Sequence, residues 1–523
     1  MGKFYITTPL YYVNSKPHIG HSYTTVACDV AARFARQSGR DVFFLTGTDE
    51  HGEKIEKATL ERGFKAGEEK RFVDEIVPVF KDLWSRLNIK YDYFIRTTDD
   101  YHVRTVQGIL SKIYADGRIY KKVYKGWFCI PCETFWSESQ APGGICPDCK
   151  RPAEKLDEAN YFFKMSEYQD WLIDHINKNP DFVRPAFRRN EVLGFLKEPL
   201  LDLCISRPKT RMNWGIEMPF DKAYVTYVWF DALTNYISAA GYPHDMERFN
   251  KWWPADCHVM AKDILRHHAV YWPIMLKAAG IEPPKTIFAH GWWVFKGEKM
   301  SKSKGNVVDP FAFISRYGID AYRYFLMREI QFGMDGSFSE DAFISRYNSD
   351  LANDLGNLLS RTLSMVEKYF SGKIPPKSAE RALSGSGAGL KTRALALGGE
   401  LAKSIPDFDF VGALTKIWEV INTANKYIED AKPWNLAKEK KVDELAAMMR
   451  ALLDTLRITA IAIYPFMPDT AANIRSQLGL GGTEPAKLSE IVEWDKLEEG
   501  VTINKSNPLF PRIEDKTKPS PRP

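Results

Sequence analysis

Two short segments, far apart in the chain, carry residue types suited to binding a phosphate. Within nine residues lie four lysines, Lys296, Lys299, Lys302 and Lys304. Like charges this close repel each other unless an anion lies among them. The second segment, PHIGH at 17–21, holds His18 and His21, which can donate to phosphate oxygens, and Gly20, which leaves the backbone open to a flat ligand. Each segment alone is a weak signal, because lysine runs are commonly solvated and histidine pairs are often satisfied in a core.

The sequence around PHIGH predicts a βαβ unit. Residues 3–12 are apolar and β-branched, as in a strand, and turn-forming residues follow them. From Ser22 onward apolar residues recur at helical spacing, Gly39 fits a C-terminal cap, and 41–47 is a short buried strand. PHIGH therefore joins a strand to a helix N-terminus, where backbone N–H groups and the helix dipole favour an anion.

A second unit of the same kind follows much later. Residues 256–262 are typical of a strand, 264–279 of a helix and 286–291 of another strand. Two such halves predict an α/β fold with a doubly wound, Rossmann-like parallel sheet, whose ligands bind at the carboxyl ends of the strands. The histidine segment follows the first strand and the lysine segment follows the last. We therefore expect both segments to face one polyphosphate at the same edge of the sheet.

Length and composition are those of an ordinary globular protein with several domains. A chain of 523 residues is too long for one compact core. Its net charge of +5 permits a nucleic-acid partner without requiring one. The N-terminal residues lack the apolar stretch of a signal peptide, and no apolar run is long enough to span a bilayer. We predict a cytoplasmic protein with no membrane partner.

Four of the seven cysteines form two C-x-x-C pairs, a spacing typical of zinc ligands. Four protein ligands would close the site to water, so the Zn²⁺ would be structural and not catalytic. The predicted ligands are Cys129, Cys132, Cys146 and Cys149. Cys28, Cys204 and Cys257 are expected to be buried small hydrophobic residues.

Shifts in composition divide the chain into segments. The cysteine pairs lie in an insertion between the two halves of the predicted sheet, and long helical periodicity begins after about Ser345. The last residues form a polar, Pro-rich tail. The predicted organisation is a catalytic domain at 1–115 and 223–290, a zinc-bearing insertion at 116–222, a region around the lysine segment at 291–345, an α-helical bundle at 346–500 and a tail at 501–523.

Taken together, these motifs resemble a known family. PHIGH and KMSKS match the two signature motifs of class I aminoacyl-tRNA synthetases. The stretches FLTGTDEHG, ISRPKTRMNWG, YVWFDAL, AKDILRHH and FAHGWW are similar to those of the methionyl-tRNA synthetase family, from Tyr5 to about Trp434. The resemblance implies a ligase that uses ATP and Mg²⁺ to convert L-methionine into methionyl-adenylate and pyrophosphate. Methionyl would then pass to the 3′ end of tRNA(Met), initiator or elongator, and the helical bundle would bind the anticodon.

The resemblance assigns the ATP chemistry to both segments. Negative charge builds up on the phosphate in the transition state, so cations fixed beside it lower the barrier. Lys302 is implied as the main pyrophosphate contact and Lys299 as its support, on a loop that closes over ATP. The implied catalytic residues are His18, His21, Lys299 and Lys302, and the ATP-binding set adds Gly20, Asp263, His290 and Gly291.

The resemblance also implies a methionine site. Asp49 would hold the ammonium group and Arg207 would orient Asp49 through a bidentate ion pair, although the residues alone allow Asp49 to be a helix cap. A thioether packs well against aromatic rings. The implied set is Leu10, Tyr12, Asp49, Arg207, Trp229, Ala232, Tyr236, Ile264 and His268. Leu233 stands where the family often has proline, so the resemblance defines the pocket lining less closely at that position.

Four residues of the helical region are implied as the anticodon-reading set. Asn353, Asn357 and Arg361 follow one another at i, i+4 and i+8, on one face of a helix, and Trp434 follows a proline that ends a helix. Amides and a guanidinium can read base edges, and an indole can stack on a base. By the residues alone, the polar face could be a solvated stripe and Trp434 a core anchor. The chain ends without room for the dimerising C-terminal domain of some family members, which favours a monomer.

Three alternatives remain from the sequence. Synthetases for leucine, isoleucine or valine carry a much larger editing insertion, and the cysteine enzyme places zinc in its substrate pocket. An RNA-independent adenylyltransferase also uses H-x-G-H, but it would leave the helical bundle without a purpose. A non-catalytic RNA-binding protein on the same fold is disfavoured by the intact histidines and lysines of the two segments.

Overall fold

A sheet of six parallel strands forms the centre of the molecule, in the order β3-β2-β1-β11-β12-β7. The structure is a computed structural model that describes residues 2–130, 134–136, 138–147, 150–295, 298–299, 308–377, 385–481 and 485–514. The strands are β1 (Lys3–Tyr12), β2 (Asp41–Asp49), β3 (Tyr93–Arg96), β7 (Val183–Arg184), β11 (Cys257–Ala261) and β12 (Ile287–His290). The chain builds outward from β1 in one direction and from β11 in the other. The doubly wound topology is therefore confirmed, with its switch point between β1 and β11.

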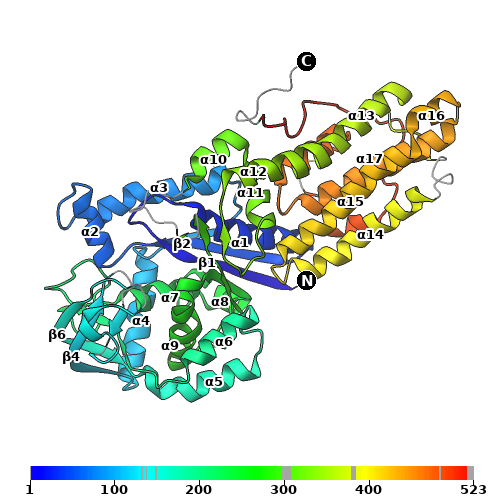
Figure 1. The fold of residues 1–523 in the computed structure, drawn as a ribbon. Helices are drawn as coiled ribbons and strands as arrows, with labels where there is room; N and C mark the ends of the chain where they lie inside the picture. Colours follow the sequence, from blue (N-terminus) through cyan, green and yellow to red (C-terminus); the bar gives the residue numbers. More distant parts are fainter. Residues whose placement is uncertain are drawn as a thin grey trace.

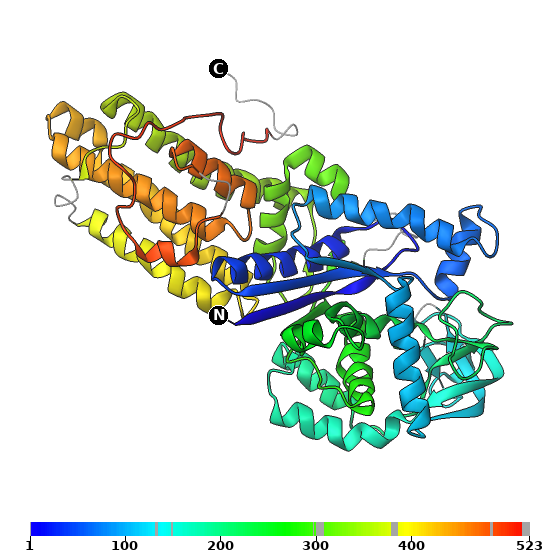
Figure 2. The ribbon, with the colours of Figure 1, turned by 180° about the vertical axis from the view of Figure 1, so that it is seen from behind.

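Helices cover both faces of this sheet (Figure 1, and Figure 2 from behind). On one face lie α1 (Ile19–Gln37) and α3 (Glu69–Arg86), and on the other α4 (Asp100–Ala115), α7 (Val228–Ala240) and α9 (Trp272–Ala279). The shorter helices α2 (Glu53–Glu61) and α8 (Met246–Trp252) complete this part. Because both faces are covered, the strands are apolar runs without alternation, and α1 is buried along nearly its whole length.

The segment between the two halves of the sheet contains a second, antiparallel sheet in the order β5-β4-β6-β8. Its strands are β4 (Ile119–Cys129), β5 (Thr134–Trp136), β6 (Glu154–Phe163) and β8 (Leu203–Cys204). The same segment holds the short helices at Pro142–Gly144 and Met165–Tyr168, α5 (Gln169–Lys178), α6 (Ala186–Phe195), and the paired strands β9 (Ser206–Pro208) and β10 (Tyr224–Thr226). It also supplies β7, whose Val183 lies opposite Ile287 of β12. The insertion therefore contributes the sixth strand of the main sheet.

After β12 the chain forms a small sheet, β14-β13-β15, and three helices. These are β13 (Trp293–Phe295), β14 (Glu298–Lys299), β15 (Gly336–Ser337), α10 (Pro310–Tyr317), α11 (Ile319–Arg328) and α12 (Glu340–Arg346). The side chain of Asp309 caps α10, and that of Ser339 caps α12. From α12 the chain continues through a π-helical stretch, Tyr347–Gly356, into the helical bundle.

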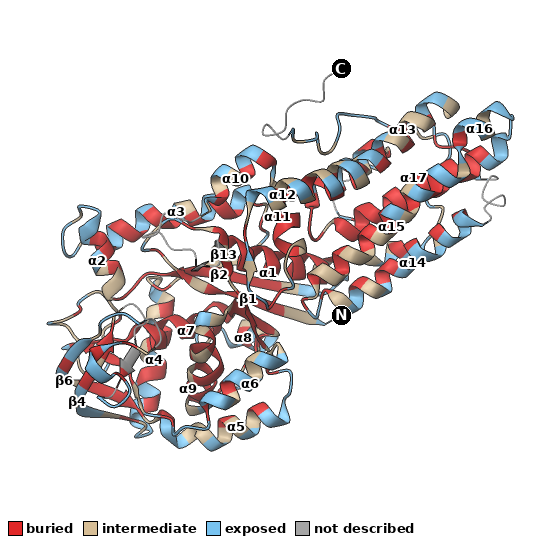
Figure 3. Cartoon of the chain, in the orientation of Figure 1, coloured by how far each residue is buried: buried red, intermediate tan, exposed pale blue. Residues whose placement is uncertain are grey.

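The bundle consists of helices packed side by side, with their buried faces turned toward one another (Figure 3). They are α13 (Asn357–Phe370), α14 (Ser386–Ser404), α15 (Phe410–Ala431), α16 (Pro433–Lys438), α17 (Val442–Ile463) and α18 (Pro468–Gln477), followed by a short helix at Leu488–Val492. Every residue of α17 from Leu445 to Ile463 is buried, so α17 is the central helix. Among the described residues, no helix is both long enough and apolar enough to cross a membrane.

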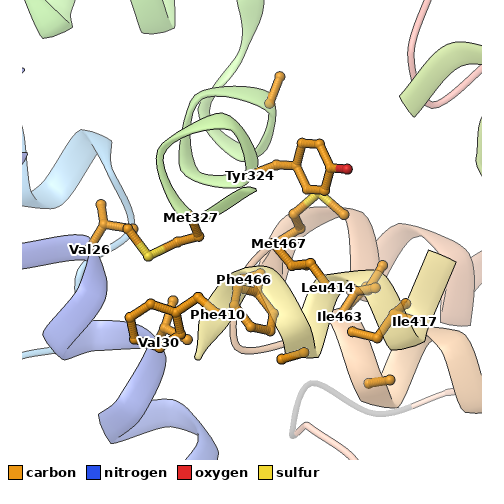
Figure 4. Close-up of a cluster of buried hydrophobic side chains, with 14 of the residues drawn as sticks. Val26, Val30, Tyr324, Met327, Phe410, Leu414, Ile417, Ile463, Phe466 and Met467 are labelled. Atoms are coloured by element: carbon orange, nitrogen blue, oxygen red, sulfur yellow. The ribbon is translucent and has the colours of Figure 1, made fainter. Parts of the chain in front are cut away.

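The bundle and the parallel sheet share one apolar core. Val26 and Val30 of α1 meet Met327 of α11, Phe410 of α15 and Phe466, which follows α17 (Figure 4). Segments far apart in the sequence therefore pack as one body at this junction.

A buried guanidinium crosses the same junction. Arg323 of α11 donates to Asp29 Oδ2 of α1 at 2.7 Å, and to the backbone carbonyls of Leu87, Pro465 and Phe466 at 3.0, 3.0 and 2.9 Å. Burial raises the pKa of Asp29, but Arg33 and Arg323 outweigh that effect and hold it below its usual value.

One predicted helix is present but irregular. Helical backbone runs through 264–279, after a 3₁₀ turn at Lys262–Ile264, and it contains a π-helical turn at His267–Tyr271 before α9. The π turn brings two consecutive side chains, His267 and His268, into the buried interior. Tertiary packing of these two rings outweighs the regular helical spacing of the sequence.

Candidate active site

His18 and His21 stand at the start of α1 with their rings stacked, 3.9 Å between centroids and 23° between planes. The N–H of Gly20 donates to His18 Nδ1, and the N–H of His18 donates to His21 Nδ1, both at 3.1 Å. A nitrogen that accepts an N–H carries no proton, so in each neutral ring the proton lies on Nε2. A Cβ atom at position 20 would lie 3.0 Å from His18 Cε1, so glycine accommodates the stack. The turn thus holds two imidazole donors at a helix N-terminus.

The first turns of α1 contact the end of β12. Thr24 Oγ1 lies 2.7 Å from His290 Nε2, and His290 Nδ1 lies 2.6 Å from the carbonyl oxygen of Gly291. Because a carbonyl can only accept, Nδ1 carries the proton and Thr24 donates to Nε2. Burial lowers the pKa of His290 to about 4, so the ring is neutral near pH 7. A Cβ atom at position 291 would lie 2.3 Å from the Met334 carbonyl, so the close approach requires glycine.

The strand β13, which leads into the lysine segment, lies beside this contact. The ring of Trp293, which starts β13, lies edge-on to Tyr23 of α1 at 5.7 Å. Lys299 of β14 pairs through its backbone with Val294 of β13. Lys302 lies outside the described residues, and its meeting with the histidines stays a prediction.

Asp263, the remaining predicted ATP residue, follows the end of β11. Its Oδ1 accepts a hydrogen bond from the Trp292 indole at 3.3 Å. His18, Asp263 and His290 thus come from the carboxyl ends of β1, β11 and β12, which are adjacent strands of the sheet. The structure brings these predicted ATP residues to one edge, as expected at a switch point.

The predicted methionine residues on β1 and β2 are neighbours. Leu10 pairs with Gly47 and Tyr12 with Asp49 in the parallel register. Asp49, 2% exposed, ends β2, and α2 has no side-chain cap, so the helix-cap alternative is wrong. Gly47 was missed by sequence reasoning: a Cβ atom there would lie 2.1 Å from the Ile95 carbonyl oxygen and 2.9 Å from Leu10 Cδ2. Glycine at position 47 therefore makes room for the wall of the site.

A second wall comes from α7, where Trp229, Ala232 and Tyr236 share one buried face. Tyr236 Oη lies 2.8 Å from His268 Nε2, and His268 Nδ1 lies 2.9 Å from the carbonyl oxygen of Ile264. Nδ1 therefore carries the proton and the tyrosine donates to Nε2. Burial lowers the pKa of His268 to about 4, so this ring is also neutral near pH 7. These five predicted residues form one connected wall.

Arg207 is buried between two aromatic rings. Its guanidinium carbon lies 4.5 Å from the Phe128 ring centroid and 4.4 Å from that of Tyr227. Its Nη1 also donates to the Ser206 carbonyl at 2.7 Å, so the plane of the guanidinium is fixed. The ion pair with Asp49 stays a prediction.

Sequence reasoning missed a buried carboxylate on α7. Asp231 Oδ2 lies 2.7 Å from His51 Nδ1, and Oδ1 lies 2.8 Å from His102 Nε2. Burial raises the pKa of Asp231, but the two histidines outweigh burial and hold it below its usual value. A signal for it existed, because an isolated aspartate in the apolar stretch VWFDAL must be bonded if that stretch is buried.

His267 was also missed. Its ring stacks on Trp229 with 3.6 Å between centroids and 17° between planes. Burial lowers the pKa of His267 well below its usual value. Within the described part of the chain, its Nδ1 and the Trp229 indole nitrogen are buried without hydrogen-bond partners. Such atoms in a binding site are candidates for ligand contacts.

Two of the four predicted zinc ligands lie in the described residues. Cys129 and Cys146 are both buried, in a small cluster with Trp136 and Ala141. The Lys150 N–H donates to the Cys146 carbonyl at 2.9 Å and closes a turn that begins at the first cysteine of the second pair. Two buried thiols and such a turn fit a closed thiolate site.

The other two predicted zinc ligands, Cys132 and Cys149, lie outside the described residues, among which no group of three or more metal ligands occurs. Cys28, Cys204 and Cys257 are buried, as predicted.

The predicted anticodon residues lie on the outer part of the bundle, on the segment that leads into α13 and on α16 (Figure 1). Asn353 and Asn357 are exposed, and Arg361 Nη1 lies 3.9 Å from Glu429 Oε1 near the end of α15. Trp434 is 50% exposed, so the core-anchor alternative is wrong. Asn353 belongs to the π-helical stretch, so its spacing to Asn357 is not that of a regular α-helix.

The fold is a parallel sheet followed by a helical bundle, with the histidine turn after the first strand of the sheet and the lysine segment after the last. This arrangement defines a class I aminoacyl-tRNA synthetase. A family model for tRNA synthetases class I (M) matches residues 4–160 and 150–363, and one for the anticodon binding domain of methionyl tRNA ligase matches residues 400–520. The chain belongs to the methionyl-tRNA synthetase family, and its activity is that of a methionine–tRNA ligase. Both matches decide against the alternatives drawn from the sequence.

Individual relatives agree with this assignment. The methionine–tRNA ligase of Caldanaerobacter subterraneus is 50% identical over 513 residues, which cover 98% of this chain and 79% of the relative. That of Thermotoga maritima is 46% identical over 518 residues, covering 98% and 81%. The structure of Mycobacterium tuberculosis methionyl-tRNA synthetase in complex with methionyl-adenylate is 40% identical, with a TM-score of 0.92 over 98% of this chain and 100% of that chain. Its free state gives a TM-score of 0.85 at 38% identity, over 98% and 99%.

Proposed function

We propose that the two signature segments act together on ATP while the methionine site presents the attacking carboxylate. An oxygen of that carboxylate attacks the α-phosphorus of ATP, and the bond to the bridging oxygen breaks. Pyrophosphate leaves with the electron pair, and methionyl-adenylate remains. No side chain acts as a nucleophile, so positioning and charge stabilisation carry the rate. A hydroxyl at the 3′ end of tRNA(Met) then attacks the carbonyl carbon of the adenylate, loses its proton and displaces AMP.

The tautomers of the paired histidines carry this proposal. Because His18 and His21 both accept backbone N–H groups on Nδ1, each keeps an Nε2 proton to donate to a phosphate oxygen. Lys299 and Lys302 offset the charge on the departing pyrophosphate, and Gly20, Asp263, His290 and Gly291 complete the nucleotide site. Mg²⁺ bound to the phosphates would neutralise further charge there.

The geometry of the second site supports methionine as the amino acid. The Asp49 carboxylate holds the ammonium group, and Arg207 orients that carboxylate through a bidentate ion pair. Leu10, Tyr12 and the α7 wall surround the side chain, where a polarizable thioether packs against aromatic rings. Because His268 is neutral, this wall presents no full charge to an apolar side chain.

Zinc and tRNA complete the proposal. Cys129, Cys132, Cys146 and Cys149 would hold a structural Zn²⁺ that shapes the insertion. Metal analysis of the purified protein should find about one zinc per chain, and Cys146→Ser should lower that ratio. Asn353, Asn357, Arg361 and Trp434 would read the CAU anticodon of initiator and elongator tRNA(Met). The enzyme would act as a cytoplasmic monomer divided into the six predicted segments.

The decisive experiment is amino-acid-dependent ATP–pyrophosphate exchange with each of the twenty amino acids. Methionine alone should support rapid exchange. Lys302→Ala should slow adenylate formation about 10²–10³-fold, as for the loss of one donor to a developing charge, with methionine binding unchanged. The matched control is Lys70→Ala, which removes an exposed lysine of α3 that pairs with Asp74. Exchange that depends on another amino acid, or a Lys302→Ala enzyme as fast as the control, would refute the proposal.

A further inference from the structure

A buried carboxylate beside the methionine site takes no part in the chemistry. Asp231 lies between Trp229 and Ala232 in α7, is fully buried, and has both oxygens hydrogen-bonded, to His51 at 2.7 Å and to His102 at 2.8 Å. A buried carboxylate is strongly unfavourable unless such bonds are complete. Its presence in a helix that is buried along its whole length is therefore explained by what it holds in place.

The two histidines belong to different elements. His51 follows Asp49 by two residues, in the turn after β2, and its ring lies 5.2 Å from that of Trp214. His102 belongs to α4, and its Nδ1 lies 2.9 Å from the Oγ of Ser238, two turns further along α7. α7 is thus bonded to α4 at two points and to the β2 turn at one. These bonds fix the rotation of α7 about its own axis.

The face of α7 opposite Asp231 is the one that lines the methionine site. At 100° per residue, Asp231 lies across the helix from Trp229 and Tyr236. The hydrogen bond from His51 to Asp231 therefore connects the strand end that carries Asp49 with the helix that carries the aromatic wall. This bond is therefore a direct link between the two halves of the amino-acid site.

We propose that Asp231 is a positioning residue that sets the distance between the ammonium-binding carboxylate and the thioether-binding wall, and so selects the length of the amino-acid side chain. The proposal rests on the methionine-site roles proposed for Asp49 and Trp229. Asp231 does not touch the substrate and acts through His51. Its chemical consequence is discrimination between methionine and thioethers that differ by one methylene, such as S-methylcysteine and ethionine.

The test is ATP–pyrophosphate exchange with Asp231→Asn, in which one histidine N–H must face an amide NH₂. We expect the KM for methionine to rise on the order of 10–100-fold, because a misplacement of about 1 Å can cost that much. The KM for ATP should stay within about threefold of the wild type, and the preference for methionine over ethionine should fall, since a methylene normally gives about 10–200-fold discrimination.

A pair of substitutions at His51 separates positioning from packing. The amide nitrogen of asparagine can take the place of Nδ1, so His51→Asn keeps the donor to Asp231, whereas His51→Leu keeps volume but removes the donor. We expect His51→Leu to behave like Asp231→Asn and His51→Asn to restore a methionine KM within about threefold of the wild type. Equal methionine KM values in the two His51 variants would overturn the proposal, even if Asp231→Asn fails to fold.

The matched control is Asp454→Asn, which removes another buried carboxylate. Asp454 of α17 is bonded to Arg457 at 2.6 Å and to the backbone N–H of Asp495 at 2.9 Å. The Asp454→Asn substitution should lower the thermal stability and leave the KM values for methionine and ATP unchanged. A folded Asp231→Asn enzyme with the wild-type methionine KM would overturn the proposal. So would an Asp231→Asn enzyme whose KM for ATP rises as much as its KM for methionine, or an Asp454→Asn enzyme whose methionine KM rises equally. A wild-type enzyme without methionine-dependent exchange would instead reject the methionine site itself.

Discussion

Replacing Arg323 with methionine removes the buried cation that joins the parallel sheet to the helical bundle. Methionine occupies a similar volume but donates no hydrogen bond. The change leaves Asp29 with Arg33 and the Lys90 N–H as partners, and it leaves the carbonyls at Leu87, Pro465 and Phe466 without the guanidinium.

The magnitude follows from these bonds. Removing one partner of a buried ion pair costs about 3–5 kcal/mol, and the lower end applies because Arg33 remains bonded to Asp29 at 2.7 Å. The stranded carbonyls add about 1–3 kcal/mol. We therefore expect the junction to lose about 4–6 kcal/mol of stability. Because the bundle carries the proposed anticodon residues, tRNA charging should fall more than ATP–pyrophosphate exchange.

The assay is urea denaturation followed by tryptophan fluorescence, with exchange and charging measured on the same preparations. Arg316→Met is the matched control, because Arg316 is exposed and its ion pair with Glu340 is worth about 0–1 kcal/mol. An Arg323→Met enzyme with the control's denaturation midpoint, or with equal losses in exchange and charging, would show that the buried cation does not hold the two parts together.

Three further outcomes are expected. Gly47→Ala should raise the methionine KM in the exchange assay and lower the stability in denaturation, because the added Cβ would lie 2.9 Å from Leu10 Cδ2. An unchanged KM and an unchanged stability would show that the added Cβ does not crowd Leu10. Burial lowers the pKa of His268 and His290 to about 4 in the folded state, whereas unfolded histidine titrates near about 6.5, so the unfolded chain binds more protons between these values. Stability should be full above about pH 6.5 and fall as the pH drops toward about 4, and His268→Gln should flatten that slope in denaturation experiments. Trp434→Ala should weaken tRNA charging and spare exchange, because the exposed indole is proposed to stack on an anticodon base; equal losses would contradict the division of labour.

The sheet was predictable from the sequence because its strands are short apolar runs separated by helices of clear period. β1, β2, β11 and β12 lie where the sequence predicts them, and right-handed crossovers then order them. The predicted ATP residues at strand ends converge for the same reason.

Other features depend on contacts that no local pattern encodes. β7 has only two residues and is a strand solely because β12 lies beside it. The π-helical turn at His267–Tyr271 and the bonds of Asp231 arise from packing between elements distant in the sequence. Gly47 could not be distinguished from an ordinary strand glycine until Ile95 was placed against it.

β7 has a consequence for how the molecule avoids self-association. Without Val183 and Arg184, the outer backbone groups of β12 would be an open edge, ready to pair with a strand of another molecule. Arg184 also forms an ion pair with Asp407 of the helical bundle at 3.1 Å, so β7, which covers the edge of β12, is itself bonded to the bundle. A shortened enzyme from which the insertion is removed would thus lose more than a peripheral module: it would acquire an aggregation-prone rim beside its nucleotide site.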